Sequence, residues 1–343
     1  QVTLGNQQDD ATFSINLYAR ENVVTTGSAH VQSIDTGGVA GLAIGDAIRI
    51  GAGGAGIVDT GGGVDRVTTT TGGVRAISTH DGKDVIKTGA GYVGFVDAGE
   101  GNDRVVVGAG GAGLVKAMGG NDSVVTGAGW VEAVTAGDGN DLVRIGGGGG
   151  GLVRLGAGDD RIAIRPTDPT HGLTVLGGSG TDTIDFSAFK RGVTFTLDSG
   201  GAWQNPAAKA GSLAAVGQGF VQETSIENLI GTAKGDRLSG DEADNLLNGR
   251  NGNDVLAGGA GDDTLIGGGG GDTFVFGANG GTDRVQDYAR SADQLRIADH
   301  SGGFAGLTIG DQGADLKIVY DGGTILLLGA AGTHLTAGDF DFV

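Results

Sequence analysis

The sequence predicts an all-β protein: a parallel β-solenoid of 19-residue coils, then a parallel β-roll and a C-terminal β cap. Three observations lead to this fold. Glycine makes up 75 of the 343 residues, whereas an average protein has roughly 7%. The chain has only 3 prolines and 5% aromatic residues, although 38% of its residues are hydrophobic. Glycines and acids recur at fixed intervals, first of 19 and then of nine residues, which is typical of coils that stack on their neighbours.

The first half of the chain contains aspartates spaced 19 residues apart. From Asp65 onward, a glycine lies two residues before each aspartate and a β-branched residue lies two after it, as in Gly101, Asp103 and Val105. A second glycine turn and a second β-branched residue complete the repeat, but that turn carries no acid. Each repeat therefore predicts two short strands, with carboxylates along one edge of the stack. The candidate metal ligands are Asp65, Asp84, Asp103, Asp122, Asp141 and Asp160, with the turn glycines Gly101 and Gly139.

The spacing changes to nine residues farther along the chain. Gly258, Gly261, Asp263 and Leu265 follow the nonapeptide pattern Gly-Gly-x-Gly-x-Asp-x-aliphatic-x. The same phase is kept by Asp236, Asn245, Asp254, Asp263 and Asp272, and an isolated match contains Asp182.

These nonapeptides resemble the RTX (repeats-in-toxin, haemolysin-type) family, calcium-binding β-roll proteins exported by type I secretion. The resemblance implies that two nonapeptides form one coil, so both edges of the roll carry acids. It implies Ca²⁺ ligands at Asp182, Asp236, Asn245, Asp254, Asp263, Asp272, Gly252 and Gly261. The C-terminal run from Leu335 to Val343 resembles an uncleaved type I secretion signal. The 19-residue repeat resembles half of an RTX coil joined to a half without calcium.

Stacked acids give a physical reason for a cation. Ca²⁺ takes six to eight oxygen ligands, and glycine turns can direct backbone carbonyls toward one point. Two unit charges 4 Å apart repel by about 4 kcal/mol at an effective dielectric constant of 20. Calcium would reverse the sign of this term, so that metal binding contributes free energy to folding. The alternative is that the Asp and Asn side chains only cap turns by accepting bonds from backbone N–H groups.

The two periods divide the chain into five predicted regions. These are an N-terminal strand or cap over 1–20, the β-solenoid over 21–165, an irregular β bridge over 166–226, the RTX β-roll over 227–282, and a cap with the secretion signal over 283–343.

Composition excludes several classes of function. The net charge of −19 argues against nucleic-acid binding, and the absence of cysteine excludes thiolate metal sites. No apolar run approaches the ~20 residues of a membrane span. The sequence contains neither a His-Glu-x-x-His nor a Gly-x-Ser-x-Gly motif. We therefore expect a noncatalytic protein; an acid and histidine pair, Asp168 and His171, leaves a polysaccharide-active β-helix as a weaker alternative.

Two surface patterns remain. Basic residues recur at outward positions on the first strand of most coils: Arg49, Arg66, Lys87, Arg104, Arg144 and Arg161. They form either a solvated face or a docking face for an anionic polysaccharide, lipopolysaccharide or a second copy. Tyr92 and Trp130 share one repeat position, where they either stack on a partner such as a sugar or fill the space left by neighbouring glycines.

Together these features predict a secreted, extracellular calcium-binding protein. We expect a structural or adhesive protein that folds on Ca²⁺ and is retained at the cell surface in an S-layer, fibre or biofilm matrix. Its expected partners are itself or a surface polysaccharide, and the type I secretion machinery. The alternative is the noncatalytic RTX module of a secreted enzyme, such as a protease, a lipase or a polysaccharide epimerase or lyase.

Overall fold

The computed structural model describes residues 1–4, 13–17, 21–37, 45–165, 172–197, 221–298 and 300–343. These residues form β-strands and two 3₁₀ helices, η1 (Gly303–Gly306) and η2 (Ala337–Asp339), with no α-helix among them. None of the described helices is long and apolar enough to cross a membrane. The predicted all-β solenoid class is confirmed. The chain divides into two compact units, Gln1–Gly180 and Thr181–Val343.

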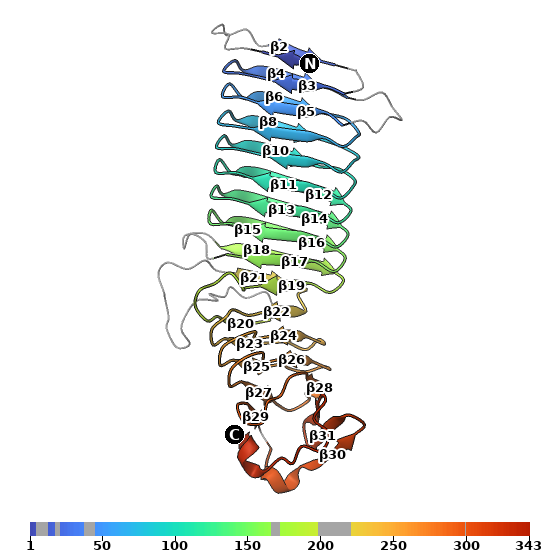
Figure 1. The fold of residues 1–343 in the computed structure, drawn as a ribbon, viewed down its shortest axis with the longest axis vertical. Coiled ribbons are helices and arrows are strands. Elements are labelled where there is room, and N and C mark those ends of the chain that lie inside the picture. The colour runs from blue at the N-terminus through green and yellow to red at the C-terminus, as the bar shows by residue number, and fades with distance from the viewer. Residues whose placement is uncertain (5–12, 18–20, 38–44, 166–171, 198–220, 299) are drawn as a thin grey trace. The chain divides into compact units, whose positions relative to one another are not determined.

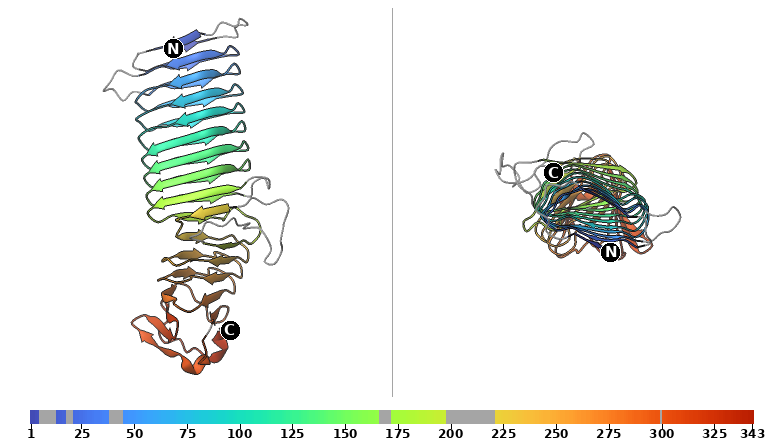
Figure 2. Two further views of the ribbon diagram at one scale, coloured as in Figure 1. Left: turned by 180° about the vertical axis from the view of Figure 1, so that it is seen from behind. Right: turned by 90° about the horizontal axis from the view of Figure 1, so that it is seen from above.

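The N-terminal unit is a stack of coils, each of which contributes one strand to each of two parallel sheets (Figures 1 and 2). The odd-numbered sheet contains β1 (Val2–Thr3), β3 (Val23–Thr25), β5 (Ala47–Ile50), β7 (Arg66–Thr69), β9 (Val85–Lys87), β11 (Arg104–Val107), β13 (Ser123–Thr126), β15 (Leu142–Ile145) and β17 (Arg161–Ile164). The even-numbered sheet contains β2 (Phe13–Asn16), β4 (Val31–Asp35), β6 (Ala55–Asp59), β8 (Val74–Ser78), β10 (Val93–Asp97), β12 (Ala112–Gly119), β14 (Val131–Asp138), β16 (Gly150–Ala157) and β18 (Leu173–Ser179).

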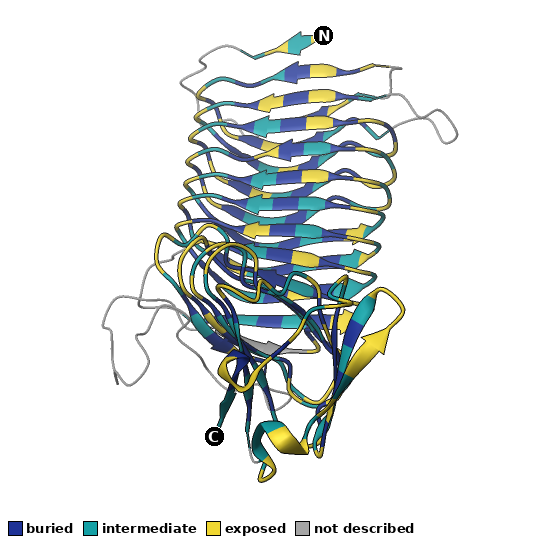
Figure 3. Ribbon diagram, turned by 60° about the horizontal axis from the view of Figure 1, so that its bottom comes forward, coloured by how far each residue is buried: buried dark blue, intermediate teal, exposed yellow. Residues whose placement is uncertain are grey.

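The 19-residue repeat sets the register of these sheets. Val105 pairs with Val124, and Val124 pairs with Val143, each 19 residues on. Val105 and Val143 are fully buried and Val124 is 1% exposed, and buried positions alternate with exposed ones along the strands (Figure 3). Stacked identical positions thus build a narrow aliphatic core, which explains how the fold forms with few aromatic residues.

The C-terminal unit repeats this arrangement with coils of 18 residues. Leu229 pairs with Leu247 and Leu247 with Leu265, so two nonapeptides form one coil, as the resemblance implies. One sheet contains β19 (Thr183–Asp185), β22 (Asn228–Ile230), β24 (Leu246–Asn248), β26 (Thr264–Ile266), β28 (Gly281–Val285) and β32 (Gly323–Leu327). The other contains β20 (Thr194–Thr196), β23 (Arg237–Ser239), β25 (Val255–Ala257), β27 (Thr273–Phe276), β29 (Gln294–Ile297) and β33 (Phe340–Phe342). A further strand is β21 (Val221–Thr224).

The end of the C-terminal unit departs from the parallel pattern. Strands β30 (Thr308–Gln312) and β31 (Asp315–Tyr320) form an antiparallel hairpin, and β31 pairs with β32. Strand β33 pairs in parallel with β29, and the Arg296 Nε donates a hydrogen bond of 2.7 Å to Asp341 Oδ2 of β33. The last residues therefore close one sheet of this unit.

The boundary between the two units falls inside the segment 166–226, for which the sequence predicts an irregular bridge. Strand β18 belongs to the first unit because Val175 pairs with Val153 of β16 and is fully buried. Strands β19 and β20 belong to the second unit. The break in period hides this continuity, since Val175 follows Val153 by 22 residues rather than 19. Residues 166–171 and 198–220 of the predicted bridge lie outside the described residues.

Candidate calcium-binding turns

The acidic turns of both units share one backbone conformation. Before Asp254 of the nonapeptide region, Arg250 and Gly252 have φ angles of 77° and 136°. Before Asp103 of the 19-residue region, Gly99 and Gly101 have φ angles of 96° and 132°. The two predicted glycines Gly139 and Gly261 occupy the same place two residues before an aspartate, with φ of 123° and 103°. Glycine is favoured there because side chains rarely adopt left-handed φ. The 19-residue coil therefore contains the same acidic turn as the nonapeptide.

The buried aspartates of the acidic turns cap the backbone of the preceding coil. The Asp103 N–H donates a 2.7 Å hydrogen bond to Asp122 Oδ1, and the Asp122 N–H donates one of 2.8 Å to Asp141 Oδ1. In the C-terminal unit, the Asp236 N–H donates a 2.7 Å bond to Asp254 Oδ1. The turn-capping alternative is thus present, but at Asp122, Asp141 and Asp254 it uses only one oxygen of the carboxyl.

The second carboxyl oxygen is unpaired in several turns. Within the described residues, Oδ2 is buried without a hydrogen-bond partner at Asp103, Asp122, Asp141, Asp254 and Asp263. At the N-terminal end of the column, by contrast, Asp65 Oδ2 accepts a 2.5 Å bond from the Thr60 hydroxyl. A buried polar atom without a partner is costly, so these oxygens call for a proton or a cation.

These turns fit a calcium ion chemically. The unpaired atoms are hard carboxylate oxygens, and a Cβ built on Gly270 would lie 1.6 Å from the Gly252 carbonyl oxygen of the coil before it. Backbone oxygens and carboxylates therefore gather along the same edge, which is the ligand set that Ca²⁺ prefers. In the described part of the chain, no three His, Cys, Asp or Glu side chains are grouped closely enough to hold a metal ion by themselves; the buried column contributes one carboxyl per turn along the edge.

Burial raises the pKa of aspartates in the columns. It raises the pKa of Asp122, Asp141 and Asp254 to about 7, and neighbouring carboxylates raise it further while the backbone N–H bond opposes the shift. Burial likewise raises the pKa of Asp103 and Asp263 to about 6. A bound cation favours the charged form of a carboxyl, so calcium and protons would compete for these oxygens.

A second, exposed row of Asx side chains precedes several members of the buried columns: Asn102, Asn121, Asn140, Asp159, Asp244, Asn253 and Asp262. The Asn121 N–H donates to Asn102 Oδ1 at 2.8 Å, and the Asp262 N–H donates to Asp244 Oδ1 at 2.7 Å. These bonds run from a later coil to an earlier one, opposite in direction to those of the buried column. An acidic turn that carries both side chains is therefore tied to both neighbouring coils.

The structure places the predicted aspartates in three columns. One lies in the N-terminal unit, and two lie in the C-terminal unit, one through Asp236, Asp254 and Asp272 and the other through Asn245 and Asp263. The Asn245 side chain fills its place as a neutral acceptor from the Asp241 N–H at 2.9 Å. The Asp182 N–H donates to Glu227 Oε2 at 2.7 Å. Calcium binding at each residue remains a prediction. The remaining predicted aspartates of the N-terminal column, Asp65, Asp84 and Asp160, join the same chain of hydrogen bonds.

Two aspartates that are not among the predicted ligands continue the columns of the C-terminal unit toward its C-terminal end. Asp283 Oδ1 accepts a 3.2 Å bond from the Asp263 N–H, and Asp293 Oδ1 accepts one of 2.9 Å from the Asp272 N–H. Burial raises the pKa of Asp283 to about 8. Their spacings of 20 and 21 residues break the repeat; the available signal was the glycine two residues before Asp283 and the buried Val285 two after it.

The acid-free edge of the N-terminal unit is capped by neutral groups. The Thr88 hydroxyl accepts a 2.9 Å bond from the Gly108 N–H of the next coil. Equivalent bonds join Gly51 to Thr26, Gly89 to Thr69 and Gly146 to Thr126. A hydroxyl satisfies the amide without adding charge, so this edge needs no cation.

Comparison with known proteins agrees with the turn chemistry. The fold and turns define a parallel β-roll with acidic glycine turns. Residues 224–256, 239–274 and 248–285 match the family model described as RTX calcium-binding nonapeptide repeat (4 copies). The chain therefore carries RTX calcium-binding repeats in its C-terminal unit.

The other comparisons are distant. The crystal structure of the extracellular lipase LipA from Serratia marcescens is similar at 19% identity with a TM-score of 0.24, over 74% of this chain and 40% of the lipase chain. The chain thus spans less than half the length of that lipase, and at this TM-score the likeness has no bearing on fold or activity. No curated protein matches the chain. The alternative catalytic pair, Asp168 and His171, lies outside the described residues.

Proposed function

We propose that this chain is an extracellular structural or adhesive protein that folds on Ca²⁺ and assembles at the cell surface, in an S-layer, fibre or biofilm matrix. The RTX repeats support the calcium requirement, because their buried carboxyls lose mutual repulsion when a cation binds. The type I secretion machinery is the export partner that we propose from the RTX resemblance.

The observation that carries the assembly proposal is a pair of oppositely charged surfaces on the N-terminal unit. We define the basic face as the exposed bases of the odd-numbered sheet: Arg49, Arg66, Lys87, Arg104, Arg144 and Arg161. We define the acidic edge as the exposed carboxylates of its acidic turns: Asp81, Glu100, Asp138 and Asp159.

The bases alternate between two rows. Arg66 and Arg104 occupy equivalent positions in β7 and β11, with Val85 of β9 between them. Lys87 lies two residues further along β9, opposite Thr68 and Val106. Like charges directly opposite each other destabilise a sheet, and this alternation avoids them while keeping the whole face positive. Because the positive charges repeat from coil to coil, we expect a partner whose negative charges also repeat along its length.

Two partners have that character. One is the acidic edge of a second copy, which would give a heterologous contact that can propagate into a filament or layer. The other is an anionic surface polysaccharide or lipopolysaccharide.

Electron microscopy with millimolar calcium and with excess EGTA tests the proposal. We expect ordered sheets or fibres only with calcium, from the chain alone or with added lipopolysaccharide. The triple variant Arg66→Glu, Arg104→Glu, Arg144→Glu should abolish them. The control Arg154→Glu, Lys190→Glu, Arg191→Glu makes the same charge change at exposed positions outside the basic face and should leave them intact. Single dispersed particles under every condition would overturn the assembly proposal and favour a noncatalytic RTX module of a secreted enzyme.

A further inference from the structure

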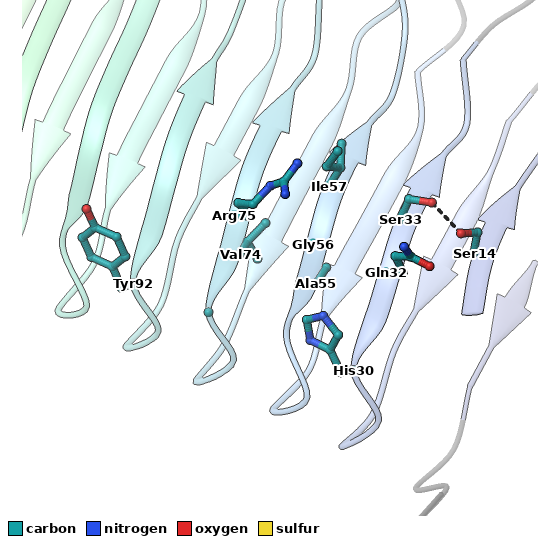
Figure 4. A pocket seen from close by; sticks show the side chains of 11 residues that line it. Ser14, His30, Gln32, Ser33, Ala55, Gly56, Ile57, Val74, Arg75 and Tyr92 are labelled. Atoms are coloured by element: carbon teal, nitrogen blue, oxygen red, sulfur yellow. Dashed lines mark hydrogen bonds between the residues drawn. The ribbon is translucent and has the colours of Figure 1, made fainter. Parts of the chain in front are cut away.

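A recess of about 820 Å³ opens on the even-numbered sheet of the N-terminal unit, on strands other than those that bear the basic face (Figure 4). It extends from Ser14 of β2 at one end to Tyr92 at the other (Figure 4), and its lining between them includes His30, Gln32, Gly56, Gly73 and Arg75. Protein sites for small ligands are typically ~300–1,000 Å³ in volume, so the recess is large enough for a short oligomer of rings.

The recess exists because side chains are missing from one stretch of the repeat. His30, Gly54, Gly73 and Tyr92 precede strands β4, β6, β8 and β10 at equivalent positions. Two glycines therefore separate the histidine from the tyrosine, a gap of three coil spacings or about 14 Å. Gly56 likewise separates Gln32 from Arg75. Glycine at Gly56 is required, because a Cβ there would lie 2.3 Å from the Gln32 carbonyl oxygen.

The side chains of His30 and Tyr92 are held in place by hydrogen bonds. His30 Nδ1 lies 3.0 Å from the Gly53 carbonyl oxygen, so Nδ1 carries the proton of that bond and Nε2 is left for a ligand. The Tyr92 hydroxyl donates a 3.3 Å bond to Glu132 Oε1, two coils away. A Cβ on Gly113 would lie 2.9 Å from that hydroxyl oxygen, so the tyrosine lies over a glycine of the sheet. The tyrosine therefore covers Gly113 of the next coil, and Tyr92 is still 48% exposed at the mouth of the recess.

The charge of the recess contrasts with that of the chain. Its lining among the described residues includes Arg75 and His30 but no Asp or Glu, although the chain has 41 acidic residues. An exposed tyrosine ring offers a stacking surface, the guanidinium binds a carboxylate with two hydrogen bonds, and Gln32 offers an amide to hydroxyl groups.

We propose that this recess binds an acidic oligosaccharide of uronate type, with one ring stacked on Tyr92 and a carboxylate bound by Arg75. The proposal is independent of the assembly described above, because it involves neither the basic face nor the acidic edge.

The test is binding of an oligogalacturonate to the full chain in calcium, followed by saturation-transfer NMR and titration, with a neutral cello-oligosaccharide as the comparison ligand. We expect the neutral ligand to bind at least about ten-fold more weakly, because the charged hydrogen bonds at Arg75 are lost. Arg75→Gln should weaken oligogalacturonate binding by about ten-fold and remove the preference for the acidic ligand. Tyr92→Leu should weaken both ligands by several-fold.

Two matched variants keep the test decisive. Trp130→Leu changes the aromatic residue at the same repeat position, two coils on and outside the recess, and Arg154→Gln removes an exposed arginine of the same sheet. Both should bind like the parent chain. Equal affinity for the two ligands, or equal losses in the recess variants and the matched variants, would overturn the proposal, whether or not the chain assembles.

Discussion

Both units stack coils whose edge backbone N–H groups need acceptors, but they bury different numbers of carboxylates to supply them. The C-terminal unit places an acidic column along both edges of its 18-residue coils. The N-terminal unit has the same acidic turn along one edge and caps the other with threonine hydroxyls such as Thr88. Capping of backbone amides therefore does not require a carboxylate. Where the chain nevertheless uses one, and leaves its second oxygen unpaired as at Asp254, the extra charge points to a cation.

Calcium removal should produce the largest effect. In excess EGTA, the buried carboxyls must be protonated or repel one another, and we expect the β signal in far-UV circular dichroism to fall sharply, with the C-terminal unit lost first. Re-addition of Ca²⁺, but not of the same concentration of Na⁺, should restore it. Unchanged spectra and melting in EGTA would show that the columns are only turn caps.

The calcium-free chain should become less stable as pH rises from about 4 to about 7. The folded pKa values of Asp122, Asp141 and Asp254 are raised to about 7, so between the unfolded and folded pKa values the folded state binds more protons. Stability then falls with pH by about 1.4 kcal/mol per pH unit for each such proton. Melting temperatures measured in EGTA at pH 5 and pH 7.5 should differ strongly, and calcium should flatten the difference. A calcium-free chain that is more stable at the higher pH would contradict the raised pKa values.

Single Asp→Asn changes sharpen the comparison between the units. Asparagine keeps an acceptor for a backbone N–H but removes the charge, as Asn245 does naturally when its Oδ1 accepts from the Asp241 N–H. Asp254→Asn should lower the free energy of unfolding by about 2 kcal/mol in calcium and by little or nothing in EGTA. Asp122→Asn should change stability in the same direction if the N-terminal column also holds calcium. A variant Asp122→Asn that is equally or more stable in calcium would confine the cation to the C-terminal unit.

The neutral edge should give the smallest effect. Thr88→Val removes the acceptor for the Gly108 N–H and should cost about 1 kcal/mol of unfolding free energy, equally in calcium and in EGTA. Thr68→Val, on the outer side of β7, serves as the control and should change stability little. A cost that depended on calcium would mean that this edge is coupled to the metal.

Periodicity made most of this fold predictable. The spacing of 19 and then nine residues predicts the parallel strands, the buried column at Val105 and Val124, and the acidic turns. Where the spacing drifts, prediction fails for a physical reason: extra residues between two stacked strands leave the strand pairing intact while they shift the sequence phase. Val175 in β18 and the column members Asp283 and Asp293 all follow such shifts. The recess at Gly56 was not predictable from the repeat, since it depends on which outward positions lack side chains in adjacent coils.

Hydrogen–deuterium exchange of the full chain, with millimolar calcium and with EGTA, tests the central claim most directly because it reads both units in one sample. We predict that EGTA abolishes protection over residues 224–285 and reduces it less over residues 45–165, where the threonine-capped edge carries no charge. Equal protection of residues 224–285 with and without calcium would contradict the claim that the acidic columns are built for a cation.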